Sequence, residues 1–391
     1  MSSAALPSSF EPRRIVVRGV NWLGDAVMTT PALHRLRERF PTASIQLLTH
    51  EKLTGLWTGH PTVDGVIPFS AKEGVFTVAR RLREGRHDLA VLFPNSHRAA
   101  LEVRLAGIPR RVGTSRRWRD WLLTDVVGIP DGIVNLKKRR PDEIRALLAR
   151  EEKIGSRRNT PLRPGPESHH THLYLRLVAA LEADPASVVP YLHVALDEMA
   201  TVRQRWNLDP AITWIGINPG AEYGPAKRWP VDRFQAVIHR LASRTGVGFV
   251  LFGGPADRGL AETIASGIGA TAPVRILAGE TSLRELCAGL SACAVLLTND
   301  TGPMHVAAAV GTPVVVPFGS TSAELTGPGL PGDSRHRLLR SNAVCAPCFL
   351  RTCPVDFRCM TGHSVDHVAA MVSEVLSQEI SIRRMERPQQ S

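Results

Sequence analysis

Short apolar runs alternate with longer amphipathic segments along most of the chain. The first run, residues 13–20, is β-branched and ends near a glycine, and the spacing becomes helical from about Thr30. Residues 43–50 and 87–95 are further apolar runs. Apolar strands separated by amphipathic helices are typical of a parallel sheet covered by helices on both faces. The N-terminal part is therefore predicted to be a doubly wound α/β domain.

This alternation stops near the middle of the chain and then starts again. Residues 150–170 are rich in Arg, Pro and Gly and are predicted to form a mobile loop. A second series begins with the apolar run at residues 212–220, and further strands are predicted at residues 247–254, 293–300 and 312–319. The repeated pattern predicts a second doubly wound domain.

The length of the chain also favours two domains. Its 391 residues exceed one ordinary hydrophobic core. We expect an N-terminal domain over residues 1–190 and a C-terminal domain over residues 191–363, facing each other across a cleft. Residues 364–391 hold a last apolar helix, expected to pack near the hinge, and a tail.

The sequence shows no signal for a membrane span or for export. No run approaches the roughly 18 consecutive apolar residues of a transmembrane helix. The first residues, "MSSAALPSSFEPRR", lack the basic start and apolar segment of a secretory signal. We therefore expect a cytoplasmic protein.

A strongly basic composition indicates an anionic partner. The net charge is +12 and the pI is about 10.1, which suits nucleic acid, an acidic membrane surface or phosphorylated small molecules. Basic residues gather at residues 110–120, 137–145 and 153–165. Any one of these clusters is readily explained as a solvated surface. Three of them in one half favour an acidic surface met by that half.

Residues 293–311, "CAVLLTNDTGPMHVAAAVG", hold the sharpest local signal. An apolar strand ends at Asp300, a turn with Thr301 and Gly302 follows, and Pro303 suits the first position of a helix. The free N–H groups of such a helix point toward the carboxyl end of the strand, where α/β sheets bind ligands and phosphates. A capped turn without a ligand explains the spacing equally well.

Two side chains in this turn have open roles. Asp300 would repel a phosphate unless its charge is offset, so it is expected to cap the turn or to accept a hydrogen bond from a hydroxyl. His305 lies one turn into the helix and can donate to a phosphate oxygen, or it is a surface residue.

The loop "NPGAEYGPAKRWP", residues 218–230, contains the positive charge that a phosphate site beside Asp300 needs. Five of its thirteen positions are Gly or Pro, so the backbone is restricted. The chain has no "GxxxxGK[ST]" phosphate loop and no Rossmann glycine spacing for a nicotinamide or flavin. Lys227 is therefore the expected phosphate contact, and a surface lysine in a tight turn is the plain alternative.

Asp25 is the candidate acid–base residue of the first domain. It follows the first strand and is expected in the loop before the first helix, facing the cleft. A carboxylate there can take a proton from an incoming hydroxyl, which is typically worth about 10²–10⁴-fold in rate. Its alternative role is to cap a helix near Ala26.

Three blocks of the sequence together resemble one known family. They are "NWLGDAVMTTPAL", "NPGAEYGPAKRWP" and "TNDTGPMHVAAAVGTPVVVPFGST". They are similar to the signature blocks of the ADP-heptose:lipopolysaccharide heptosyltransferases, glycosyltransferase family 9, and the middle block most resembles the type II enzymes. The resemblance covers about residues 15–325.

The resemblance implies a GT-B glycosyltransferase that inverts the anomeric centre and needs no metal for catalysis. By the same resemblance Asp25 is the catalytic base and Lys227 contacts the donor phosphates. The site for ADP-heptose, ADP-L-glycero-D-manno-heptose, would be lined by Asp300, Thr301, Gly302 and His305. Asp257 is a candidate partner for the donor ribose.

The implied acceptor is the anionic inner core of lipopolysaccharide, at heptose I of heptosyl-Kdo2-lipid A. Such an acceptor suits a basic N-terminal domain that associates peripherally with the inner face of the cytoplasmic membrane. His97 and Arg98 are candidates for the acceptor side, and a surface helix with salt bridges is the alternative for this segment.

A cysteine cluster follows the second domain's last strand. Cys345, Cys348, Cys353 and Cys359 begin with the Cys-x₂-Cys spacing of zinc or iron–sulfur knuckles, but the later spacings are looser than in a standard ribbon. A structural zinc or iron site and a set of free thiols fit equally. The other two cysteines, Cys287 and Cys293, are expected in the core.

Other functions fit less of the sequence. The alternatives within the class are a type I or III heptosyltransferase and an enzyme that uses another nucleotide sugar. A basic nucleic-acid-binding protein is disfavoured, since no recognition motif is present and three tyrosines leave little for base stacking. An inactive nucleotide-sugar binder would not need Asp25 and Lys227 together.

Overall fold

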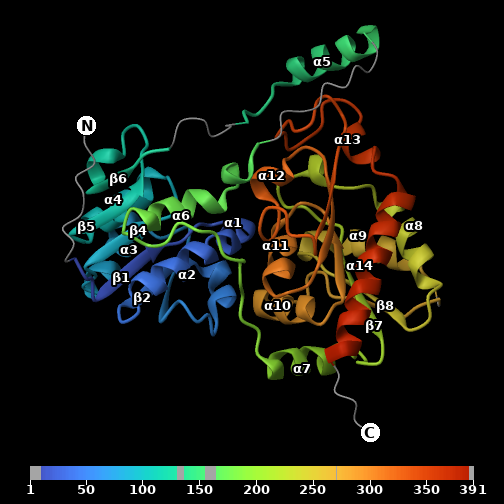
Figure 1. Cartoon of the computed structure of the whole chain (residues 1–391), viewed down its shortest axis with the longest axis horizontal. Helices are drawn as coiled ribbons and strands as arrows, with labels where there is room; N and C mark the ends of the chain where they lie inside the picture. The colour runs from blue at the N-terminus through green and yellow to red at the C-terminus, as the bar shows by residue number, and fades with distance from the viewer. Residues whose placement is uncertain (1–9, 130–135, 155–163, 270, 387–391) are drawn as a thin grey trace. The chain divides into compact units, whose positions relative to one another are not determined.

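The chain divides into two compact units. The computed structural model describes residues 10–129, 136–154, 164–269 and 271–386 (Figure 1). The first unit comprises Met1–Ile133 and Glu167–His193, and the second comprises Val134–Pro166 and Val194–Ser391.

A six-stranded parallel sheet forms the centre of the first unit. Its strand order is β3-β2-β1-β4-β5-β6. The strands are β1 (Arg14–Arg18), β2 (Ser44–His50), β3 (Gly65–Phe69), β4 (Leu89–Leu92), β5 (Arg110–Thr114) and β6 (Asp125–Val127). Residues 15–18 of β1 and all of β4 are buried, as expected for strands covered on both faces.

Helices cover both faces of this sheet. Helix α2 packs on α6, and α3 packs on α4. The helical segments are α1 (Leu23–Met28), α2 (Thr30–Arg39), α3 (Val75–Glu84), α4 (His97–Leu105) and α6 (Thr171–Ala179), with short 3₁₀ turns η1 (Glu51–Trp57) and η2 (Asp120–Leu122). Leu33 and Leu36 of α2 are fully buried.

The second unit repeats this plan. Its parallel sheet has the order β12-β11-β10-β7-β8-β9. The strands are β7 (Thr213–Asn218), β8 (Val247–Leu251), β9 (Val274–Ile276), β10 (Val295–Thr298), β11 (Val314–Phe318) and β12 (Arg337–Arg340). Counted within each unit, both sheets have the strand order 3-2-1-4-5-6, so the predicted pair of doubly wound α/β domains is confirmed.

Two helical layers enclose the second sheet. Helix α14 packs on α8, and α10 packs on α7 and α11. The helices are α7 (Leu196–Arg205), α8 (Val231–Ala242), α9 (Arg258–Ser266), α10 (Leu283–Ser291), α11 (Gly302–Ala309), α12 (Ala323–Thr326), α13 (Arg358–Thr361) and α14 (Val365–Glu386), with 3₁₀ turns η4 (Pro225–Lys227) and η5 (Pro255–Asp257). Val368 and Val372 of α14 are fully buried, so this last helix completes the core of the second unit.

One segment differs from the sequence-based expectation. Helix α5 (Pro141–Ile154) belongs with the second unit, although its residues were assigned to the N-terminal domain. Its Ile144 and Leu148 pack against Cys345 and Cys348, a contact across about half of the chain that local patterns do not reveal.

The prediction of a mobile loop at residues 150–170 agrees only in part with the structure. Residues up to 154 end α5, and a 3₁₀ turn, η3, forms at Pro166–Ser168. The rest of that prediction, at residues 155–163, lies outside the described residues. Within the described chain, the helices are all too short or too polar to cross a membrane.

A buried ion pair links β1 to α4 in the first unit. Arg18 donates to the Glu102 carboxylate at 3.0 Å, and Arg98 binds the other oxygen of this carboxylate at 2.8 Å. Glu102 is fully buried, and burial lowers the pKa of Arg18 despite this partner. The carboxylate therefore depends on both guanidinium groups to offset the loss of water.

We predict that Glu102→Gln lowers the free energy of unfolding by about 3–5 kcal/mol, because it leaves Arg18 buried without a counter-charge. The matched control is Glu84→Gln, which removes an exposed carboxylate 3.9 Å from Arg80 and should cost less than about 1 kcal/mol. Urea unfolding of both variants checks this. Equal losses would show that the buried pair contributes no more than a surface pair.

Candidate functional site

The second unit presents polar groups where its strand order reverses. Strands β7 and β10 are neighbours, and their last residues, Asn218 and Thr298, lie opposite each other in the sheet. The Asn218 amide donates to the Thr298 hydroxyl at 3.2 Å, and both residues are buried. Ligands of open α/β sheets bind outside the carboxyl ends of the strands at such a point.

Asn299 fixes the loop over residues 218–230. Its amide nitrogen donates to the carbonyl of Pro219 at 2.7 Å, and its amide oxygen accepts the backbone N–H of Trp229 at 2.9 Å. The Asn299 side chain is fully buried, so these bonds have no competition from water. The loop is therefore held at both ends by one side chain as well as by its glycines and prolines.

Lys227 and Asp300, predicted separately, form an ion pair. The Lys227 ammonium donates to the Asp300 carboxylate at 2.7 Å and lies 5.1 Å from the centre of the Tyr223 ring. Thr321, in the loop after β11, donates its hydroxyl to the same carboxylate oxygen at 2.6 Å. The charge of Asp300 is thus offset, as a phosphate site at this turn requires.

Glycine makes this loop geometry possible at one position. Gly224 has a φ of +150°, and a Cβ there would lie 2.5 Å from the carbonyl oxygen of Arg351. The same carbonyl accepts the backbone N–H of Ala226 at 3.0 Å. Any larger residue at 224 would push away the backbone that supports η4, and η4 carries Lys227.

Helix α11 begins directly after Asp300. It runs from Gly302 to Ala309, with Thr301 as its N-cap and Pro303 in its first turn, as the sequence predicted. Thr301 makes no side-chain capping bond, so the capped-turn alternative does not apply to its hydroxyl. His305 is buried, and its alternative interpretation as a surface residue is wrong.

Asp257 lies against the start of the loop. Its carboxylate accepts the backbone N–H of Gly254 at 3.1 Å and lies 3.6 Å from the guanidinium of Arg228. A Cβ on Gly220 would lie 2.3 Å from Asp257, so the glycine leaves room for this approach. The structure therefore brings Asp257 to the loop that carries Lys227.

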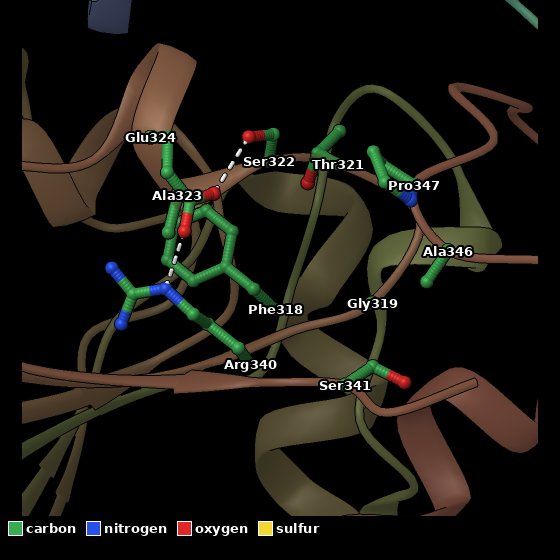
Figure 2. A pocket seen from close by; sticks show the side chains of 10 residues that line it. All are labelled: Phe318, Gly319, Thr321, Ser322, Ala323, Glu324, Arg340, Ser341, Ala346 and Pro347. Carbon is green, nitrogen blue, oxygen red and sulfur yellow. Dashed lines mark hydrogen bonds and ion pairs between the residues drawn. The ribbon is translucent and has the colours of Figure 1, made fainter. Parts of the chain in front are cut away.

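A hollow beside Asp300 was not anticipated from the sequence. Figure 2 shows that the loop after β11 and the end of β12 line it together, with Arg340 paired to Glu324 and Ser322 donating to Glu324. Thr321, which contacts Asp300, is part of this wall. The sequence Gly-Ser-Thr that ends at Thr321 indicates only a loop after a strand, so Thr321 was not a candidate residue.

In the first unit, Asp25 lies in the first turn of α1 and not in a loop. The N-cap of this six-residue helix is Trp22, so the helix-cap alternative for Asp25 is also wrong. Asp25 is half-buried. Burial raises the pKa of the Tyr174 phenol well above its ordinary value, and the nearby charge of Asp25 raises it further. Asp25 therefore has a protonated phenol in its surroundings.

The acceptor-side candidates begin α4. Helix α4 follows β4, which pairs with β1, so His97 and Asp25 follow neighbouring strands of one sheet edge. Arg98 is bound to Glu102 and to the carbonyl of Glu73 at 2.6 Å, which agrees with the salt-bridged helix that the sequence allowed. His97 is exposed and lies 6.3 Å from the Trp121 ring.

Four cysteines, Cys345, Cys348, Cys353 and Cys359, line one small cavity in the second unit. Burial raises the pKa of Cys359 to about 12 and also raises those of Cys345 and Cys348. Across the residues that the structure describes, no group of three or more ligating side chains is arranged to hold a metal ion. The remaining pair, Cys287 and Cys293, is fully buried as predicted.

Comparison with known proteins identifies the family. The model of glycosyltransferase family 9 (heptosyltransferase) matches residues 155–357, more than half of the chain. Among curated relatives, lipopolysaccharide heptosyltransferase 2 of Escherichia coli K12 is 31% identical over 81% of this chain and 85% of its own length. The enzyme of the same name from Salmonella typhimurium is 30% identical over the same shares.

Solved structures agree with this match. The structure of E. coli ADP-heptose lps heptosyltransferase II is similar over 94% of this chain and 99% of its own, with a TM-score of 0.73 and 28% identity. A family 9 glycosyltransferase from Veillonella parvula has the same TM-score at 22% identity and supports the fold. The chain therefore belongs to glycosyltransferase family 9, the heptosyltransferases, and is a glycosyltransferase with the GT-B fold.

Proposed function

We propose that this enzyme transfers heptose from ADP-L-glycero-D-manno-heptose to the inner core of lipopolysaccharide, at heptose I of heptosyl-Kdo2-lipid A. The observation that carries the proposal is the Lys227–Asp300 pair at the N-terminus of α11, at the point where the strand order reverses. The names of the type II relatives support the choice of donor and acceptor.

The donor diphosphate is proposed to bind at this pair. The ammonium of Lys227 and the N–H groups at the start of α11 supply positive charge, and that charge stabilises the leaving ADP as its bond to the sugar breaks. Thr301, Gly302 and His305 lie at this helix start. Asp257, on the other side of the loop, is the proposed partner of the ribose.

The transfer step is proposed to invert the anomeric carbon without a metal. Asp25 accepts the proton of an acceptor hydroxyl, and that oxygen attacks the anomeric carbon from the face opposite ADP. The new bond forms as the bond to the diphosphate oxygen breaks, through an oxocarbenium-like transition state.

The acceptor is proposed to lie along the same edge of the first sheet as Asp25. His97 and Arg98 begin the helix after the neighbouring strand. Acceptors that carry acidic sugars, phosphates and a lipid anchor suit a basic protein. We therefore place the enzyme in the cytoplasm, peripherally attached to the inner membrane.

Asp25→Asn should lower acceptor-dependent ADP release by at least about 10²-fold with ADP affinity unchanged, because the amide cannot take the proton. ADP release from ADP-heptose with heptosylated Kdo–lipid A measures this. Asp184→Asn is the control, since this half-exposed carboxylate pairs with Arg35 at 3.2 Å and accepts the backbone N–H of Ala186 at 2.8 Å, with no proposed part in the transfer. Full activity of Asp25→Asn would exclude the base role.

Lys227→Gln should weaken ADP binding by about 10–100-fold, because a charge-assisted contact to phosphate is lost. Isothermal titration with ADP measures the effect, and Lys153→Gln on the exposed side of α5 is the control.

The double variant Lys227→Gln with Asp300→Asn separates two causes of that loss. If Lys227 binds the diphosphate itself, the double variant stays weak. If Lys227 only neutralises Asp300, removing both charges should restore the affinity for ADP and the direct contact is refuted.

We also propose that the cysteine segment takes up one structural zinc or iron ion. Four thiols face one cavity, and the backbone N–H of Phe357 already donates to the sulfur of Cys353 at 3.3 Å. Burial raises the pKa values of the Cys345, Cys348 and Cys359 thiols, so uptake of an ion must release their protons.

Metal analysis of the full chain, purified without chelator, should find one equivalent of zinc or iron. Cys348→Ser should lose that equivalent, whereas Cys287→Ser, in the core outside the cluster, should retain it. A wild-type protein that is folded and free of metal, and that stays so after incubation with zinc or ferrous iron under reducing conditions, would refute the site.

A further inference from the structure

The loop after β5 exposes two tryptophans in the first unit. Trp118 is 78% exposed and Trp121 is 61% exposed. Large aromatic side chains normally gain free energy by leaving water, so exposing two of them in one short loop needs a reason. We call residues 115–122 the tryptophan loop.

The tryptophan loop is held firmly in place. Asp120 accepts the hydroxyl of Ser115 at 2.8 Å and the backbone N–H of Arg116 at 2.7 Å. Arg119 is buried and donates to the carbonyls of Thr114 at 3.1 Å and Pro94 at 2.9 Å. The exposed tryptophans are therefore presented by a fixed backbone and are not the tip of a loose segment.

Trp118 also has an unfavourable backbone conformation. Its φ is +66°, in the left-handed region that bulky side chains rarely adopt. The side chain gains little burial in return, since most of it is exposed. Strain of this kind that packing does not repay is a mark of a functional position.

Positive charge surrounds the two rings. Arg104, Arg116 and Arg117 are exposed, and among the described residues none of the three has an acidic side chain within ion-pair distance. The Arg104 guanidinium lies 5.2 Å from the Trp121 ring. The loop's own acid, Asp120, is occupied by Ser115 and Arg116.

We propose that the tryptophan loop docks on the anionic phospholipid headgroups of a membrane. Indole rings settle at the membrane–water interface because they combine an apolar face with a polar N–H group. The Trp121 N–H donates to the Trp118 carbonyl at 3.2 Å, so Trp121 offers mainly its apolar face. Unpaired arginines beside them are attracted to anionic lipid. The loop's acid, Asp120, already accepts two hydrogen bonds within the loop, so the exposed groups of the loop are the two rings and the arginines.

Docking there would bring the catalytic edge toward the lipid. The tryptophan loop follows β5, and β5 pairs with β4, which pairs with β1, the strand that precedes Asp25. All three strands are parallel, so their carboxyl ends share one edge of the sheet. The tryptophan loop would then be the surface by which the enzyme attaches to the membrane. The reason for this attachment rests on the proposed function, although lipid binding itself does not require heptose transfer.

Sedimentation of the full chain with vesicles tests the proposal. Wild type should bind phosphatidylcholine vesicles that contain phosphatidylglycerol, bind pure phosphatidylcholine far less, and release at high salt. The double variant Trp118→Ala with Trp121→Ala should bind about tenfold less. The double variant Arg116→Gln with Arg117→Gln should also bind the vesicles about tenfold less, and its remaining binding should depend less on salt.

Leu196→Ala is the matched control, because Leu196 is 81% exposed in the second unit and should not affect binding. Failure of wild type to bind the acidic vesicles, or equal binding by the tryptophan double variant, would overturn the proposal. So would full displacement from vesicles by short duplex DNA at equal phosphate concentration, since that result would identify a nucleic-acid surface.

Activity on a delipidated, water-soluble acceptor separates this proposal from the proposed function. If the tryptophan variant loses vesicle binding and keeps this activity, both stand. If it keeps vesicle binding and loses this activity with its fold intact, the loop serves the acceptor sugars and membrane docking is refuted. If wild type binds vesicles but transfers no heptose, the proposed function fails and the docking surface stands.

Discussion

The second unit depends on the neutralisation of one buried carboxylate. Asp300 is 4% exposed, and a carboxylate at that depth needs a partner for its charge. Lys227 reaches it from a loop more than seventy residues earlier, so the loop must hold one conformation. Asn299 and Gly224 provide that conformation, one by bonding the backbone and the other by admitting Arg351. The proposed phosphate site at α11 rests on this balance of charge.

Sequence patterns predicted the parts of this site but not how they are joined. Strand and helix periodicity placed α11 and Pro303, and the glycines and prolines marked the loop that carries Lys227. The direct bond between Lys227 and Asp300 was not predicted, because pairing across distant segments has no local pattern. Thr321 was missed for the same reason, since its hydroxyl is informative only beside Asp300.

Two further differences have clear physical causes. Asp25 was expected in a loop because α1 has only six residues, fewer than two turns, and such a helix has no measurable apolar period. Helix α5 was assigned to the wrong unit because its partners, Cys345 and Cys348, lie about two hundred residues later. For α5, tertiary contacts determined a placement that the residue types alone do not reveal.

The distribution of charge separates two uses of the basic composition. In the loop that carries Lys227, this lysine is matched by Asp300 and Arg228 lies near Asp257, so little net charge remains there. On the first unit, the exposed Arg116 and Arg117 of the tryptophan loop form no ion pair within the part of the chain that the structure describes. An ion pair suits a site in which one bound ligand takes the place of a side-chain partner. Arginines without an acidic partner instead attract an extended anionic surface over a longer range. The net charge of +12 therefore reflects the surface more than the proposed donor site.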